Sequence, residues 1–457
     1  MSMNTHIQRP KAVRRRGAAL LAAATMVAGV LALAPSGVAS ATSTVTLSII
    51  ANVNPELTEM QHFTPAFERA NPGIKVKYDI LPEDESRPKV LQDLSTHAGE
   101  FDIVMIDSYD TPIYAKNGWL ENLTPFLKSA PAYDVSDLIP TAASNLSYQG
   151  SLYALPFYTE SSFLMYRKDL FAKAGLKMPL HPTWSQVAQF AKTLNDPSAK
   201  LSGICLRGEA GYGENMAVYN MIVDTFGGRF FNMQWKPQLL SAPVVAATNF
   251  YVNLLRKYGE PGAATAGWSQ CLNAYVKGHT AMWVDATSLA PAIATESKAM
   301  LANTGFAYAP VAKTKYSGWL YTLGWGIPVG TAHPDQAFKY ISYMTSRNFI
   351  HAVGLKYGWA SVPPGTRKST YAYPGVKSAP FSALTLASIA HADASHPSIQ
   401  PTPYTGINNL NFPQWVTIGN FMSNELSGAI AGKESVRAAL TASQAEWGSV
   451  MSAAGYR

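Results

Sequence analysis

Residues 148–171, which read YQGSLYALPFYTESSFLMYRKDLF, decide how this chain folds. Apolar and aromatic residues fill most of the stretch, but a polar cluster at 158–162 interrupts them. The apolar run that follows, Phe163–Tyr166, predicts a buried strand. Polar residues between two buried strands are unexpected inside one hydrophobic core. They are expected where the chain leaves one lobe and enters a second lobe beside a solvated cleft.

The same stretch resembles the interdomain crossover of the extracellular solute-binding proteins of sugar ABC importers. The next segment, AGLKMPLHPTWSQVAQFAKTL at 174–194, resembles that family's pattern of Ala-Gly, a proline, Thr-Trp and a helix. GICLRG at 203–208, AMWVDAT at 281–287 and GWASVPPGTRKSTY at 358–371 resemble the sorbitol- and mannitol-binding branch. The resemblance covers nearly all of the chain after its N-terminal leader. It implies an α/β type II periplasmic-binding-protein fold, in which a three-crossing hinge joins two lobes.

Composition agrees with two globular lobes, because 47% of the 457 residues are hydrophobic. The net charge of +7 arises mainly from five basic residues before residue 42, a region without acidic residues. The other 31 basic residues nearly balance the 29 acidic ones. This balance argues against a basic surface for nucleic acid or for a membrane.

The N-terminus reads as a cleavable signal peptide, residues 1–41. Basic residues precede an apolar run, Gly17–Leu33, and Ala39-Ser40-Ala41 offers a cleavage site. A membrane anchor is the alternative, since the run is about the minimum length for one. No cysteine lies near the cleavage site, so we expect a periplasmic protein without a lipid anchor. The Arg14-Arg15 pair leaves both Sec and twin-Arg export open.

Alternating and apolar runs predict a βαβαβ order at the start of the mature chain. Strands are expected at 44–51, 73–80 and 101–106, with a helix at 83–97. In the second lobe we expect strands at 203–206 and 280–284, and helices at 183–194 and 244–258. A strand at 305–310 is expected to return the chain to the first lobe. Residues 319–328 and a helix at 334–345 then complete the first lobe, a third crossing lies near 359–365, and C-terminal helices include 434–454. The predicted lobe segments are 42–158 and 309–362 for the first lobe, and 159–308 and 363–457 for the second.

Polar residues follow several of these predicted strands, where open α/β sheets bind ligands. Helix capping would also explain single residues of this kind, but not their clustering. If the sheets are parallel, the clusters face one cleft. The predicted ligand-binding residues are Asn52, Asn54, Glu83, Tyr109, Tyr158, Glu160, Ser161, Arg207, Trp283, Asp285, Trp319, Tyr321, Trp359 and Arg367, with Tyr404 as an addition.

A linear polyol offers only hydroxyl groups, so its site needs acceptors, donors and an apolar wall. Glu160 and Asp285 are expected to accept hydrogen bonds, and Arg207 and Arg367 to donate them. The tyrosines and tryptophans would form the wall. A place in the core is the alternative for Trp283 and Trp359, and a place on the surface is the alternative for Arg367.

No catalytic, cofactor or metal motif is visible. The chain has no GxGxxG after its first strand, no GxSxG and no P-loop, and its nine histidines never occur as HxH or HExxH. A carboxylate pair of Glu160 and Asp285 keeps a glycoside hydrolase open as an alternative. Cys205 and Cys271 could form a disulfide or remain two buried thiols.

The sequence therefore predicts a monomeric solute-binding protein without a cofactor. It would capture a sugar alcohol such as sorbitol or mannitol and present it to an ABC permease. A sugar such as a glucoside or trehalose is the alternative ligand, and a sensor subunit is the alternative role.

Overall fold

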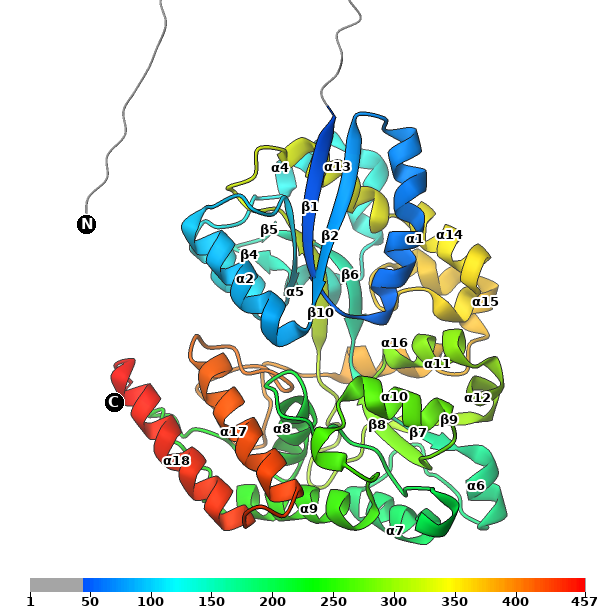
Figure 1. Ribbon diagram of the computed structural model, residues 1–457, viewed down its shortest axis with the longest axis vertical. Helices are drawn as coiled ribbons and strands as arrows, with labels where there is room; N and C mark the ends of the chain where they lie inside the picture. Colours follow the sequence, from blue (N-terminus) through cyan, green and yellow to red (C-terminus); the bar gives the residue numbers. More distant parts are fainter. Residues whose placement is uncertain (1–43, 457) are drawn as a thin grey trace, which may run out of the picture. The chain divides into compact units, whose positions relative to one another are not determined.

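The computed structural model describes residues 44–456, so the predicted signal peptide lies outside the described part of the chain. Two large sheets organise these residues, and a third, two-stranded sheet lies at 147–152 (Figure 1). The first has five strands in the order β2-β1-β3-β10-β6, and the second has three strands in the order β8-β7-β9. We call each sheet with its helices a lobe, the first lobe and the second lobe.

The first lobe begins with the predicted βαβαβ unit. Its strands β1 (Val45–Asn52), β2 (Ile74–Leu81) and β3 (Ile103–Asp107) confirm the three expected strands, and β1 pairs in parallel with both neighbours. The connecting helices α1 (Pro55–Ala70) and α2 (Glu83–Thr96) lie on opposite sides of the sheet (Figure 1). Asn54 caps α1, because its side chain accepts a hydrogen bond from the Leu57 N–H at 3.0 Å.

The remaining elements of the first lobe are α3 (Asp110–Lys116), α4 (Thr124–Ser129), α5 (Pro140–Asn145), β4 (Ser147–Tyr148), β5 (Ser151–Leu152), β6 (Ala154–Glu160), β10 (Tyr321–Gly326), α13 (Pro334–Met344), α14 (Arg347–Tyr357) and α15 (Pro374–Lys377). Strand β10 enters between β3 and β6, antiparallel to both.

The second lobe contains β7 (Ser162–Arg167), α6 (Lys168–Lys173), α7 (Trp184–Leu194), α8 (Asn215–Thr225), α9 (Ala242–Tyr258), α10 (Trp268–Val276), β8 (Met282–Ala286), α11 (Leu289–Glu296), α12 (Lys298–Asn303), β9 (Thr304–Tyr308), α16 (Ser382–His391), α17 (Trp415–Ile430) and α18 (Val436–Ala453). Its helices at 184–194 and 242–258 confirm the predicted ones. Cys205 and Cys271 form a disulfide.

The expectation of parallel sheets is wrong for the second lobe, because β8 and β9 both pair with β7 in antiparallel register. The reason lies at the crossover: β6 ends at Glu160 and β7 starts at Ser162, so β7 runs away from the first lobe. Ser162 pairs with Ala286, and the end of β8 therefore still lies at the crossover. The polar residues meet as predicted, although the strand directions differ.

The predicted strand at 203–206 is not a regular strand. This segment makes only isolated bridges, such as Cys205 with Trp283, along the edge of β8. The predicted third crossing also lies further along the chain. The Thr159 N–H donates to Pro364 O, and the Ile139 N–H donates to Thr366 O, both at 2.9 Å, so this segment still packs on the first lobe. The chain reaches β7 and β9 only with α16, which moves the start of the last second-lobe segment from 363 to beyond Lys377.

Candidate functional site

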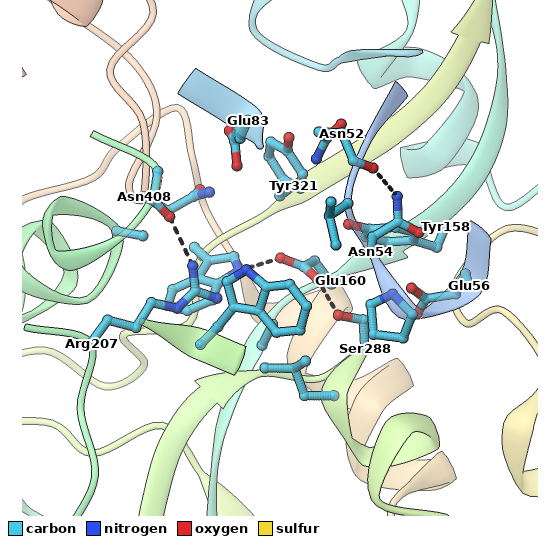
Figure 2. Close-up of a pocket in the computed structure, with 18 of the residues that line it drawn as sticks. Asn52, Asn54, Glu56, Glu83, Tyr158, Glu160, Arg207, Ser288, Tyr321 and Asn408 are labelled. Atoms are coloured by element: carbon cyan, nitrogen blue, oxygen red, sulfur yellow. Dashed lines mark hydrogen bonds between the residues drawn. The ribbon is translucent and has the colours of Figure 1, made fainter. Parts of the chain in front are cut away.

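A pocket lies at the crossover between the two sheets, and both lobes contribute to its wall (Figure 2). We call it the cleft pocket. Eight of the predicted ligand-binding residues line it: Asn52, Asn54, Glu83, Tyr158, Glu160, Arg207, Trp319 and Tyr321. Residues that the prediction did not include also line it: Val53, Pro55, Glu56, Gly213, Ala217, Trp268, Ala286, Ser288, Leu289, Asn408 and Asn409.

Glu160, the last residue of β6, is the central acceptor of the cleft pocket. The hydroxyl of Ser288 donates to its Oε2, and the Trp319 indole N–H donates to its Oε1 at 3.2 Å. Burial raises the pKa of Glu160 to about 7, although the Ser288 hydrogen bond and the charge of Arg207 oppose the shift. A carboxyl group of this kind can accept hydrogen bonds, and its protonated form can also donate one.

Arg207 lines the cleft pocket and is held from behind by Asp285. Its Nε donates to Asp285 Oδ2 at 3.0 Å, and its Nη1 donates to the carbonyl of Gly213 at 2.8 Å. Burial disfavours the charged guanidinium, but Asp285 outweighs this and raises the pKa of Arg207 above its ordinary value. The geometry fixes the guanidinium as a hydrogen-bond donor at one end of the pocket.

Asp285 does not line the cleft pocket, which corrects its predicted role as an acceptor for ligand. Its side chain is fully buried, and it accepts from both Arg207 and the Trp283 indole N–H, the latter at 3.0 Å. Trp283 is fully buried as well, so its alternative placement in the core is the one observed. Asp285 holds Arg207 directly, and Trp283 holds Asp285, so both residues help to position Arg207.

Two further predicted residues belong to the packing of the first lobe. The Arg367 guanidinium is buried over the Tyr133 ring, 4.4 Å from its centroid, and its Nε donates to Thr345 O at 2.9 Å. This place in the core differs from both readings of Arg367 that the sequence offered. Trp359 stacks on Tyr373 with ring centroids 4.5 Å apart.

The last predicted residues support the pocket or lie elsewhere. The Tyr109 hydroxyl donates to Asn408 Oδ1 at 2.8 Å, and its ring stacks on Tyr321, so it supports two wall residues. Ser161 is buried in the crossover itself, where its N–H donates to Thr287 Oγ1 at 3.1 Å. The Tyr404 hydroxyl accepts from the Phe230 N–H at 2.9 Å, inside the second lobe.

Arg87 on α2 is a supporting residue that the sequence did not reveal. It forms ion pairs with Glu83, Asp107 and Asp110. Its Nη2 donates to the Tyr321 hydroxyl at 3.1 Å, which orients that wall residue. On its other side the guanidinium lies 5.3 Å from the ring centroid of Tyr212, which belongs to the second lobe.

The described residues offer one group with metal-ligand spacing, Cys205, Glu260 and Cys271. The two sulfur atoms of this group are joined in the disulfide, so they are not the thiolates that bind metals well. Within residues 44–456, no helix has the length and the apolar character that spanning a bilayer requires.

The family model of the bacterial extracellular solute-binding proteins matches residues 53–347. A mannitol-binding protein of Pseudomonas aeruginosa is 39% identical over 414 residues, which are 90% of this chain and 94% of that protein.

Solved structures agree with the family match. An ABC transporter solute-binding protein of Agrobacterium vitis, solved with bound D-mannitol, is 42% identical and superimposes with a TM-score of 0.87. The match covers 90% of this chain and 99% of that protein. A second such protein, from Agrobacterium radiobacter in complex with ribitol, is 23% identical with a TM-score of 0.78, covers 90% of this chain and 99% of its own, and shares the fold.

Proposed function

Because the chain belongs to the bacterial extracellular solute-binding proteins, we propose that it captures a sugar alcohol in the cleft pocket and delivers it to the permease of an ABC importer. The relative of 39% identity is a mannitol-binding protein, and the structure of 42% identity holds D-mannitol. Mannitol and its stereoisomer sorbitol are therefore the first ligands to test.

The chemistry of the cleft pocket supports an uncharged, hydroxyl-rich ligand. Glu160 and the side chain of Asn52 offer oxygen acceptors, and Arg207 offers donor N–H groups. The rings of Trp319 and Tyr321 supply an apolar wall for C–H groups. The observation that carries the proposal is that acceptors from the first lobe and a donor from the second face one pocket, so that hydroxyl groups would join the two lobes.

The same geometry supports binding without turnover. A glycosidase needs two carboxyl groups that both reach the substrate. Asp285, the partner that the sequence suggested for Glu160, is fully buried behind Arg207 and does not line the pocket, so this pair cannot act on a substrate. Glu56 and Glu83 also line the pocket, but the chain belongs to a family of solute-binding proteins. Incubation with mannitol, sorbitol and aryl glycosides should therefore give no product, and turnover that Glu160→Gln abolishes would contradict this.

We also propose that the protein works outside the cytoplasm after removal of residues 1–41. The support is the signal-peptide pattern together with membership of an extracellular family. N-terminal sequencing of the exported protein should begin at Thr42. An N-terminus that retains the apolar run would contradict cleavage.

The direct test is calorimetric titration of the mature protein against polyols and sugars. We expect saturable binding of one mannitol or sorbitol per chain, weaker binding of trehalose and glucosides, and a higher melting temperature with the preferred polyol. Because the ligand is uncharged, its affinity should change little between low and physiological salt. A tenfold loss of affinity over that range would indicate an anionic ligand instead.

A further inference from the structure

A second cavity, which we call the side cavity, adjoins the cleft pocket. The two share Val53, Asn54, Pro55, Glu56 and Trp268 as common wall residues, so they are direct neighbours. The side cavity extends from there past Glu59 on α1 to Tyr357 and the second-lobe helices α10 and α11. Nothing in the polyol proposal uses this space.

Two carboxyl groups of the side cavity each have one oxygen atom without a partner. Glu56 and Glu59 are only 5% and 7% exposed. Glu56 Oε1 and Glu59 Oε2 are buried without a hydrogen-bond partner within residues 44–456. An unpaired buried carboxylate is costly, so such a group either holds a proton or waits for a cation.

No cation of the chain fills this role at the side cavity. Its described lining contains no lysine, arginine or histidine. Arg207 is committed to Asp285, and Arg87 is committed to Asp107 and its neighbours. Burial raises the pKa of Glu56 to about 8 and that of Glu59 to about 9, and the neighbouring carboxylates add to both shifts. Both carboxyl groups therefore favour the protonated form at neutral pH.

We propose that the side cavity binds the ammonium group of an aminated polyol whose hydroxyl chain occupies the cleft pocket. This rests on the proposed function. The ammonium would pair with Glu59 and Glu56, with the rings of Trp268 and Tyr357 in the same wall. Charge balances by exchange: the carboxylic acid releases one proton as the ammonium ion binds to the carboxylate that remains.

An ammonium group fits this cavity better than a free metal ion. Calcium and magnesium need six or more oxygen ligands close around one point. Among residues 44–456, the only group of three or more convergent acidic, cysteine or histidine ligands is the one at the disulfide. An ammonium group needs fewer acceptors, and the polyol chain that carries it would be held separately.

The test is paired calorimetry with mannitol and 1-amino-1-deoxymannitol on wild type and Glu59→Gln. Glu59 lines the side cavity but not the cleft pocket, and glutamine keeps its shape. We expect Glu59→Gln to weaken the affinity for the aminated polyol at least about tenfold, since a hydrogen bond to a charged group is lost. Mannitol affinity should change less than about twofold. Glu296→Gln, at an exposed position of the same cavity, is the matched control and should change neither.

Titrations in buffers of different ionisation enthalpy provide a second readout. The wild type should release a proton when it binds the aminated polyol and none when it binds mannitol. Equal affinity of wild type and Glu59→Gln for the amine, or an equal loss for both ligands, would overturn the subsite. If mannitol binds and the amine does not, the subsite alone fails, and if neither binds, the polyol function itself fails.

Discussion

The two ends of the cleft pocket treat buried charge in opposite ways. At one end, Arg207 is paired with Asp285, which in turn accepts from Trp283. At the other end, where the side cavity adjoins the pocket, Glu56 and Glu59 each have an oxygen atom with no partner in the described chain. Figure 2 shows Arg207 and Glu56 at opposite sides of the view, with Glu160 between them. Arg207 is therefore a donor that is fixed before the ligand arrives, whereas the charge of Glu56 and Glu59 depends on what binds.

The largest effect is expected at the fixed end, from Asp285→Ala. The change leaves Arg207 buried without its counter-ion, which costs about 3–5 kcal/mol in the free energy of unfolding. Urea denaturation measures that loss, and mannitol affinity should fall with it because Arg207 is no longer held. Asp285→Asn, which keeps the shape, should lose less stability. Normal stability with lost affinity would mean that Asp285 contacts ligand after all.

Glu160→Ala probes the middle of the pocket, where acceptor and ligand are expected to meet. Loss of a hydrogen bond to a charged group costs about 1.5–3 kcal/mol, so mannitol affinity should fall roughly tenfold to a hundredfold. Stability without ligand should change less than affinity, because the hydrogen bonds lost from Ser288 and Trp319 are partly offset by relief of the cost of burying the Glu160 carboxylate. Calorimetry and melting of the same samples check both statements. Unchanged affinity would place the ligand elsewhere.

The pH dependence of stability tests whether Glu59 is a buried acid. The pKa of Glu59 is raised from 4.5 to about 9, so between these values the folded state binds more protons than the unfolded state. Stability should then fall as pH rises between pH 5 and pH 8, by up to roughly 1.4 kcal/mol per pH unit for this one group. Glu59→Gln should flatten the pH dependence of the melting temperature. An identical slope in wild type and variant would show that Glu59 is not a buried acid in solution.

A smaller effect is expected where the lobes touch beside Arg207. A Cβ atom at Gly213 would lie 2.8 Å from Glu83 Oε1, across the cleft pocket. Gly213→Ala should therefore hinder close approach of the lobes. We expect mannitol affinity to fall roughly threefold, which is less than the tenfold change that about 1.4 kcal/mol would cause. Gly448→Ala, where an added Cβ meets nothing within 4 Å, is the control. Unchanged mannitol affinity in Gly213→Ala would show that ligand binding does not require close approach of the lobes at this position.

Much of this comparison was accessible from sequence. Polar residues after buried strands correctly predicted Asn52, Asn54 and Glu160 on the pocket wall, because a strand end at a crossover must face the cleft. The sequence did not distinguish a residue that lines the pocket from one directly behind it. Asp285 and Trp283 lie in the expected place, but one layer too deep to line the pocket.

The residues that were missed have a common physical cause. Asn408 and Asn409 lie in a loop far from the other wall residues in sequence, and Tyr109 and Trp415 hold them in place through hydrogen bonds. Such tertiary contacts leave no periodic signal. Arg367 was instead included wrongly among the ligand-binding residues. Without knowledge of its neighbours, an arginine that is buried against an aromatic ring cannot be distinguished from one that binds ligand.

The most direct test of the account is a calorimetric titration of the mature wild-type protein with D-mannitol, with Asp285→Asn and Glu160→Ala in parallel. We predict saturable binding of one mannitol per chain, a strong loss of affinity in Glu160→Ala, and a loss of affinity in Asp285→Asn that accompanies reduced stability. No heat and no shift of the melting temperature with mannitol or any other polyol, in a folded protein that binds a different solute, would contradict it.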